Sequence, residues 1–253
     1  MGTRYFADKQ GAQNYAIYRP SYPDSVFASC INFLKNGATN EVNKFPFAVD
    51  VGCGTGHQST VPLAKYFDSV LGIDISKEQI SEAKKSKHPE NVDFKVSAGE
   101  ALPVENETVS LLQVAAAAHW MDLAKFYKEA DRVLTPGGVV ALYSYAGAAQ
   151  TSNHPKSAEI DPILKEIAER PVERGFFVPG NDMVRRRYTD ECFQIPYSDK
   201  TRMEEAEPDL TKQWMEDATS RLLNALETTD MSSQFTYYLE VHMLLGRKPH
   251  QPK

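Results

Sequence analysis

The stretch Ala48-Val49-Asp50-Val51-Gly52-Cys53-Gly54-Thr55-Gly56 decides how this chain folds. An apolar run from Phe47 to Val51 predicts a buried strand of a parallel sheet. Glycines then occupy every second position, and glycine lets the backbone adopt positive φ and approach a ligand closely. A helical pattern from about Gln58 to Tyr66 predicts a helix whose first turn offers unpaired N–H groups. This order of elements favours a site for a polar ligand over a tight turn that binds nothing.

The spacing of the glycines separates two kinds of nucleotide site. The dinucleotide fingerprint G-x-G-x-x-G places its third glycine three residues after the second. Here Gly56 follows Gly54 by two residues, which gives G-x-G-x-G instead. Asp74 comes directly after a second apolar run, and a carboxylate at the end of the second strand can accept both hydroxyls of a ribose. The pattern therefore predicts a nucleotide-like ligand whose sugar is held by Asp74.

Strands and helices alternate along the middle of the chain. Four further strands are expected, at residues 69–73, 91–96, 108–115 and 139–145. A helix capped by Asp24 precedes the first strand, a capping box at Ser76 opens another helix, and His119-Trp120-Met121-Asp122 opens a third. The third helix is expected to bury Leu123, Phe126, Ala130 and Val133. Thr135-Pro136-Gly137-Gly138 is expected to turn the chain into the fifth strand. This rhythm predicts a doubly wound, mostly parallel α/β sheet.

The chain is expected to form a single domain, residues 1–253, with four parts. These are an N-terminal helical lead-in or lid (1–44), a ligand-binding core (45–145), a substrate lid inserted after the fifth strand (146–203), and a C-terminal helix and strand (204–253). The lid is inferred because long irregular insertions in compact domains are often binding loops. It is expected to hold a helix at about 157–169, and later elements are expected at 194–207 (strand), 210–227 (helix) and 235–245 (strand).

Composition narrows the classes of partner. The formal net charge is −6, and Lys and Arg are scattered apart from Arg185-Arg186-Arg187, which argues against nucleic acid as a partner. No apolar run approaches the roughly 18 residues that a membrane helix needs, so no membrane span is expected. The first residues lack the apolar stretch of a secretory signal. Three widely spaced cysteines predict neither a disulfide framework nor a metal site, and a cytoplasmic location is expected.

Four motifs together resemble the class I S-adenosylmethionine (SAM) dependent methyltransferases. In chain order they are Asp50–Gly56, Gly72-Ile73-Asp74, Gly99-Glu100-Ala101-Leu102-Pro103 and Leu134-Thr135-Pro136-Gly137-Gly138. The resemblance covers roughly residues 45–145. It implies a seven-stranded, Rossmann-like sheet, S-adenosyl-L-methionine as the cofactor, and methyl transfer as the activity.

A narrower likeness lies outside these motifs. Tyr15-Ala16-Ile17-Tyr18-Arg19-Pro20-Ser21-Tyr22-Pro23, Ala117–Asp122 and the closing Leu245-Gly246-Arg247-Lys248-Pro249 are similar to the trans-aconitate methyltransferase-like group. Members of this group act on small molecules, and in fungi they esterify carboxylic acids. This chain departs from many relatives at Ala98, where an Asp would accept from the adenine amino group, and at Ser110 in the fourth strand.

The resemblance implies a role for each cofactor-binding residue. Backbone of the glycine loop would lie along the methionine moiety, with Asp50 near its amino group. Asp74 would take the ribose hydroxyls, Ile75 would lie against the adenine, and Gln113 or Ala115 would face the sulfonium side. The implied set is Asp50, Gly52, Gly54, Thr55, Gly56, Asp74, Ile75, Gly99, Glu100 and Gln113.

The methyl acceptor leaves alternatives open. His119 is a candidate general base for a hydroxyl or amine, or else a hydrogen-bonding residue that orients Trp120. A carboxylate acceptor is already ionised, so it needs a cation to position it rather than a base. Arg19 is the first candidate for that cation. The arginine triplet is the second candidate, or else it is a solvated surface run. Tyr18 is placed with His119 and Arg19 as catalytic. The substrate pocket is expected to be lined by Tyr15, Tyr18, Arg19, His119, Trp120 and Tyr145.

The main hypothesis is therefore O-methylation of a small carboxylic acid to its methyl ester. Methylation of a hydroxyl or amine with His119 as the base is the second. A nicotinamide oxidoreductase on the same sheet and a SAM-binding protein without catalysis are weaker alternatives. The expected partner is a small-molecule substrate, and the chain is expected to be a monomer or a homodimer.

Overall fold

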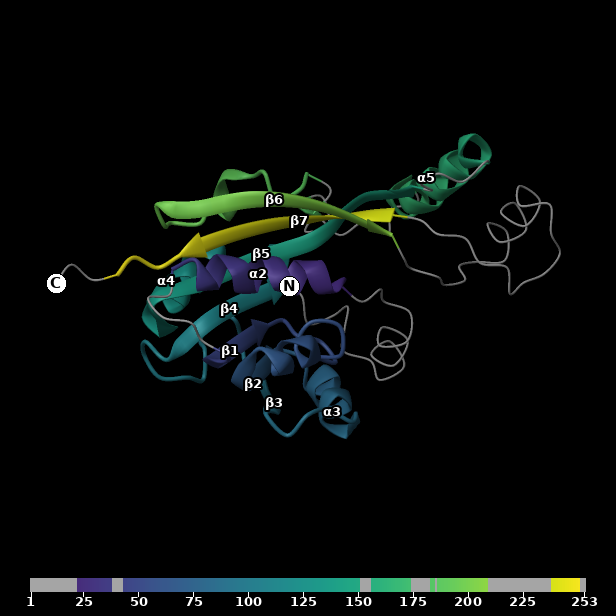
Figure 1. The fold of residues 1–253 in the computed structure, drawn as a ribbon. Coiled ribbons are helices and arrows are strands. Elements are labelled where there is room, and N and C mark those ends of the chain that lie inside the picture. Colours follow the sequence, from purple (N-terminus) through teal and green to yellow (C-terminus); the bar gives the residue numbers. More distant parts are fainter. Residues whose placement is uncertain are drawn as a thin grey trace.

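The computed structural model describes residues 22–37, 43–150, 156–173, 183–184, 186–208 and 238–250. Seven strands form one sheet in the order β3-β2-β1-β4-β5-β7-β6, with β3 at one edge and β6 at the other (Figure 1). Their bounds are β1 Phe45–Val51, β2 Phe67–Asp74, β3 Val92–Val96, β4 Val109–Ala115, β5 Leu134–Gln150, β6 Asp199–Pro208 and β7 Tyr238–Arg247. All pairs are parallel except those of β7 with β5 and β6. The doubly wound, mostly parallel, seven-stranded α/β fold is thus confirmed.

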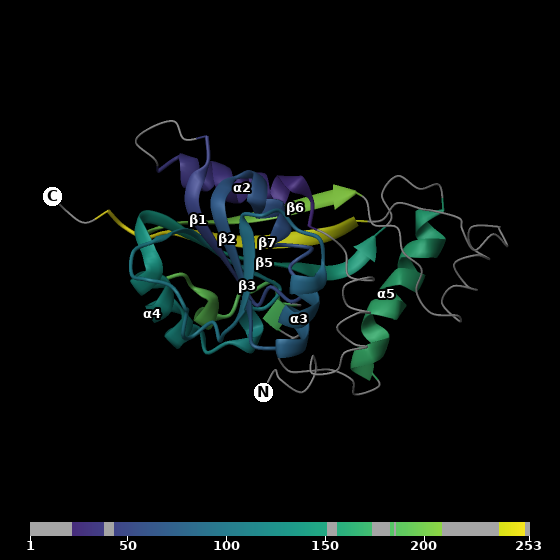
Figure 2. The same cartoon turned by 90° about the horizontal axis from the view of Figure 1, so that it is seen from below.

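Helices cover both faces of the sheet, and α2 and α4 lie on opposite sides of it (Figure 2). The α-helices are α2 Asp24–Lys35, α3 Lys77–Lys85, α4 Leu123–Val133 and α5 Ser157–Glu173, and the 3₁₀ turns are η2 Val61–Lys65, η3 Ala118–Trp120 and η4 Glu191–Phe193. Of these helices, all within the described ranges, none has both the length and the apolar character needed to cross a membrane.

Alternation along the central strands builds two cores. In β1, Ala48 packs with the α2 cluster, whereas Val49 and Val51 pack with the α4 cluster. The same alternation holds in β4 and β5, because successive side chains of a strand point to opposite faces. In α4 the residues buried against the sheet are the four expected ones, Leu123, Phe126, Ala130 and Val133.

The chain between β1 and β2 differs from the expectation. The predicted helix at 58–66 is wrong, because only the five-residue turn η2 forms there. The backbone N–H groups of Thr60 and Val61 both donate to Gly56 O, at 3.0 Å each, which is a loop rather than a helical ladder. Phe67 is the fully buried first residue of β2. No α-helix therefore begins in this described loop.

Two smaller expectations differ from the structure. Asp24 does not cap α2: the N-cap is Pro23, and the Asp24 carboxylate instead accepts from Lys65 Nζ at 2.8 Å. The fifth strand begins at Leu134 rather than Val139, and residues 135–138 interrupt it as a bulge: Leu134 pairs with Val109, Val139 pairs with Leu111, and Gly137 has a φ of 83°. Gly137 N–H donates to Lys248 O, and Lys248 N–H donates to Gly138 O, which ties this bulge to the chain after β7.

The capping box is confirmed, since Ser76 Oγ accepts from the Gln79 N–H at 3.2 Å. The helix expected at 157–169 forms as α5, between β5 and β6, and lies beyond the carboxyl end of β5 (Figure 1). β6 begins at Asp199, inside the segment expected to be a lid. The helix expected at 210–227 falls outside the described residues.

Candidate functional site

The carboxyl ends of β1, β2, β3 and β4 meet at one edge of the sheet. They bring together the glycine loop Gly52–Gly56, Asp74, the loop 97–100 and the turn η3. Ligands of open α/β sheets bind in the crevice outside these strand ends, next to the point where the strand order reverses. Here that point lies between β1 and β4.

The glycine loop needs its glycines. Gly52, Gly54 and Gly56 have φ values of 70°, 58° and 74°, in the left-handed region that side chains disfavour. A Cβ at Gly52 would lie 2.4 Å from Ala117 Cβ. The N–H groups of Gly52 and Cys53 donate to Ile73 O at 2.8 and 2.9 Å, which fastens the loop to the end of β2.

Asp74 connects this loop to α3. Its Oδ2 accepts from the Gly54 N–H at 2.9 Å, and its Oδ1 accepts from the Ser76 N–H at 2.8 Å. Burial raises the pKa of the Asp74 carboxyl, and hydrogen bonds from the backbone N–H groups of Ser76, Gly54 and Ile75 oppose that rise. A carboxylate offers about four lone-pair sites, so Asp74 can still accept a hydroxyl group.

Two large apolar side chains next to Asp74 face solvent. Ile75 is 55% exposed and Val96 is 46% exposed, and Val96 is the register partner of Asp74 on β3. Ile75 and Val96 thus offer apolar surface on either side of the fixed carboxylate. A flat, apolar ring lying on this pair would remove both from water.

Asp50 lies beneath the glycine loop. Its side chain is fully buried, and Oδ2 accepts from Ser59 Oγ at 2.7 Å and from Thr60 Oγ1 at 2.6 Å. Burial raises the pKa of Asp50 from 3.8 to about 6, although the hydrogen bonds from Thr60 and Ser59 lower it. In this position Asp50 anchors the chain after the loop, a role that the sequence did not indicate.

Gln113 is the register partner of Asp50 on β4 and is equally buried. Its Nε2 donates to Ser59 O at 2.9 Å, and its Oε1 accepts from the Tyr143 hydroxyl at 3.1 Å. The structure therefore places Gln113 as a bridge between three elements. The hydroxyl oxygen of Thr55 is buried with no hydrogen-bond partner in the described part of the chain, so the glycine loop retains an unpaired polar atom.

The loop after β3 contacts the segment after β4. Glu100 Oε1 accepts from the Asp122 N–H at 2.8 Å, which ties this loop to the start of α4. A Cβ on Gly99 would lie 2.9 Å from Met121 Sδ, and a Cβ on Gly52 would lie 3.6 Å from Met121 Cε. Met121 thus lies over both glycines, and sequence reasoning missed it because methionine carries no polar signal.

His119 stands in η3, at the exit of β4. Its Nδ1 lies 3.0 Å from the hydroxyl oxygen of Tyr188, and its ring centroid lies 4.9 Å from that of Trp120. Tyr188 was also missed, because it is 69 positions away in the sequence. Tyr145, expected in the substrate pocket, stacks on Tyr22 with 4.4 Å between ring centroids.

Several predicted residues lie outside the described part of the chain: Tyr15, Tyr18, Arg19 and Arg185. Of the other two arginines in the triplet, Arg186 forms an ion pair with Asp190 at 3.2 Å. Arg187 is partly buried and has a φ of 60°.

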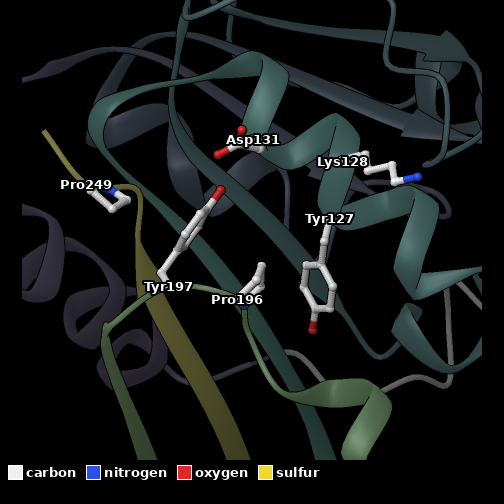
Figure 3. A pocket seen from close by; sticks show the side chains of 6 residues that line it. All are labelled: Tyr127, Lys128, Asp131, Pro196, Tyr197 and Pro249. Atoms are coloured by element: carbon white, nitrogen blue, oxygen red, sulfur yellow. The ribbon is translucent and has the colours of Figure 1, made fainter. Parts of the chain in front are cut away.

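A surface pocket of about 530 Å³ lies elsewhere, between α4 and the segments before β6 and after β7 (Figure 3). Its lining comes from α4, from the chain before β6 and from the chain after β7: Tyr127, Lys128, Asp131, Pro196, Tyr197 and Pro249. None of these residues belongs to the glycine loop or to the loops around Asp74. The pocket is therefore separate from the candidate site.

Comparisons with known proteins agree with this geometry. Residues 49–142 match the family model described as a methyltransferase domain. The chain is 36% identical over 151 residues to a Dictyostelium discoideum protein named as a candidate methyltransferase, covering 59% of this chain and 53% of that protein. It is 30% identical over 148 residues to a Saccharomyces cerevisiae protein named as a candidate S-adenosylmethionine-dependent methyltransferase, covering 56% of this chain and 48% of that protein. The chain thus spans about half the length of these curated relatives.

A solved structure shares the fold. A protein of Anaeromyxobacter dehalogenans, described as a candidate type II methyltransferase, superposes with a TM-score of 0.68 at 23% identity, covering 92% of this chain and 100% of that one. Residues 49–142 therefore match a methyltransferase domain model, and the strand order and overall fold are those shared with this solved structure.

Proposed function

We propose that this chain transfers the methyl group of SAM to a small-molecule acceptor. The observation that carries the proposal is the Asp74 carboxylate, held by the N–H groups of Gly54 and Ser76 beside two exposed apolar side chains. A fixed carboxylate that can accept hydrogen bonds from hydroxyl groups, next to an apolar surface, matches a ribose joined to an adenine. The carboxylate already holds the loop and the start of α3, whereas the exposure of Ile75 and Val96 is what a bound ligand accounts for.

The residues at this edge fit SAM. The ribose hydroxyls would donate to Asp74, the adenine would lie on Ile75 and Val96, and the methionine moiety would follow the glycine loop near the Thr55 hydroxyl. When bound, SAM supplies an activated methyl group on a sulfonium. The residues of the chain then have to align the acceptor with that methyl group and exclude water.

Calorimetry tests the donor. We expect SAM to bind and NADH not to bind, because the G-x-G-x-G loop differs from the dinucleotide fingerprint. Binding of NADH in place of SAM would contradict the proposal. SAM binding without methyl transfer to any compound in a broad screen would point to the non-catalytic alternative.

The first candidate acceptor is a small carboxylic acid, which methyl transfer would convert to its methyl ester. Its support is the likeness to the trans-aconitate methyltransferase-like group, and its cation would be Arg19, outside the described residues. A mass-spectrometric screen of acids, phenols, alcohols and amines for the gain of one methyl group tests it. Arg19→Leu should then raise the KM of the acid far more than that of SAM, and equal kinetics would exclude this clamp.

One specific observation favours the second candidate, a hydroxyl or amine acceptor. His119 lies at the exit of β4 with Nδ1 already 3.0 Å from a buried phenol, and a histidine held in this way is typical of a general base. In this case His119→Ala should lower kcat on a hydroxyl or amine. Unchanged kcat on such a compound would exclude the base.

A further inference from the structure

Tyr188 brings the chain between α5 and β6 against the proposed active site. Its hydroxyl lies 3.0 Å from Nδ1 of His119, and the two ring centroids are 6.2 Å apart. The Tyr188 side chain is 2% exposed. A buried phenol in contact with one ring nitrogen is suited to fixing the orientation of an imidazole.

Tyr188 is itself held on several sides. Its ring stacks on Phe193 with centroids 4.2 Å apart and planes at 16°. The guanidinium of Arg202 donates to the carbonyl oxygens of Arg187 and Tyr188, at 2.7 and 2.8 Å. The Tyr188 N–H donates to Met183 O at 3.0 Å.

The backbone here is in an unfavourable conformation. Arg187 and Tyr188 have φ values of 60° and 51°, so two consecutive residues with side chains are left-handed. Such residues persist only where their surroundings hold them, and they concentrate at functional sites. The contacts of Phe193 and Arg202 supply that support, and together they present the hydroxyl of Tyr188 to His119.

We propose that Tyr188 is a positioning residue that orients His119 as the general base. This inference rests on the proposed methyl transfer, and it selects an acceptor that carries a proton, a hydroxyl or an amine. The Nδ1–H of His119 donates to the Tyr188 oxygen, so the ring lone pair that takes a proton is on Nε2. A lone pair of the acceptor forms the new bond to the methyl carbon. The carbon–sulfur bond breaks with its electron pair left on sulfur, and the acceptor proton passes to Nε2.

The tautomer of His119 tests this inference without any substrate. Long-range ¹H–¹⁵N spectra of the full chain labelled with ¹⁵N-histidine, with His119 assigned by its loss in His119→Asn, should show the neutral ring protonated at Nδ1. Tyr188→Phe keeps the ring that stacks on Phe193 and removes the oxygen, so the proton should move to Nε2. A parent protein already protonated at Nε2 would overturn the proposal.

Kinetics give the second readout. On the phenol, alcohol or amine that gains a methyl group in the screen, Tyr188→Phe should lower kcat by roughly 10- to 100-fold, with the KM for SAM unchanged. Tyr197→Phe, a buried tyrosine of the separate pocket, is the matched control and should change neither readout. Unchanged kcat in Tyr188→Phe, or methylation of carboxylic acids alone, would refute the positioning role. A parent that binds no SAM would refute the proposed function instead, and the tautomer would show separately whether Tyr188 orients the ring.

Discussion

The backbone N–H of Gly54 donates to Oδ2 of Asp74 at 2.9 Å, which joins the loop after β1 to the end of β2. Both the loop and the carboxylate are parts of the proposed SAM site. Because one carboxylate oxygen holds the loop and the other holds the start of α3, the position of the loop and that of the ribose acceptor are coupled. Changing Asp74 should therefore affect the whole donor site.

Asp74→Ala should weaken SAM binding by roughly 100-fold, because two hydrogen bonds to a charged group are lost. Asp74→Asn retains one acceptor oxygen, so its affinity for SAM should lie between that of Asp74→Ala and that of the parent. Isothermal calorimetry with SAM measures both. Asp68→Ala, at the exposed start of the same strand, is the control and should bind as the parent does. Parent-like affinity in Asp74→Ala would remove the ribose assignment.

Substitutions at Gly56 and Gly72 distinguish the stability cost of backbone strain from that of a steric clash. A Cβ would lie 2.2 Å from Phe94 Cε1 at Gly56 and 2.6 Å from Phe94 Cδ1 at Gly72, but Gly56 alone of the pair has a positive φ, 74°. In a Phe94→Val background, Cys53 Sγ at 3.1 Å is the remaining close neighbour of a Cβ at Gly72, so Gly72→Ala should cost less than Gly56→Ala, which should still cost roughly 1–2 kcal/mol. Urea unfolding measures both differences. Equal costs in that background would show that φ does not matter at Gly56.

Asp50 makes stability depend on pH. Its pKa is about 6 in the folded protein against an ordinary value of 3.8, so the folded state binds the proton more tightly. The resulting stabilisation is complete below the unfolded value and is lost as pH rises through about 6. Asp50→Asn has no charge to bury. As pH rises from 3.8 to above about 6, its free energy of unfolding should therefore increase relative to that of the parent by about 3 kcal/mol.

Urea unfolding of both proteins between pH 4 and pH 7.5 measures the effect. The difference in the free energy of unfolding should rise with pH and level off above about 6.5. A difference independent of pH would mean that the Asp50 carboxyl titrates normally in the folded protein.

Arg247 fastens α2 to the sheet. Its guanidinium is buried, pairs with Asp199 Oδ2 at 2.7 Å, and donates to the carbonyl oxygens of Phe33, Leu34 and Gly137. Arg247→Met should lower the free energy of unfolding by roughly 2–4 kcal/mol, because these groups lose a charged donor. Lys84→Met on the exposed side of α3 should change it by less than about 0.5 kcal/mol. Similar values for the two variants would contradict this role.

Part of the candidate site could be predicted from the sequence, because its residues lie at the ends of predicted strands. Asp74 was placed correctly beside the glycine loop, since the carboxyl ends of adjacent parallel strands meet at one edge. Its binding role stays a proposal. The buried face of α4 was also predicted, since helical spacing fixes which residues share a side. The helix at 58–66 failed because the hydroxyls of Ser59 and Thr60 bind the buried Asp50 instead.

Strand and helix periods, the glycine spacing and the position of Asp74 after an apolar run were enough to predict the sheet, the glycine loop and the carboxylate beside it, because each is a local pattern along the backbone. The contacts of Tyr188 with His119 and of Arg247 with Phe33 join residues 69 and 214 positions apart, and they became visible only in the folded chain. The physical reason is that such contacts depend on where two distant segments pack, and no local pattern of side chains encodes that distance.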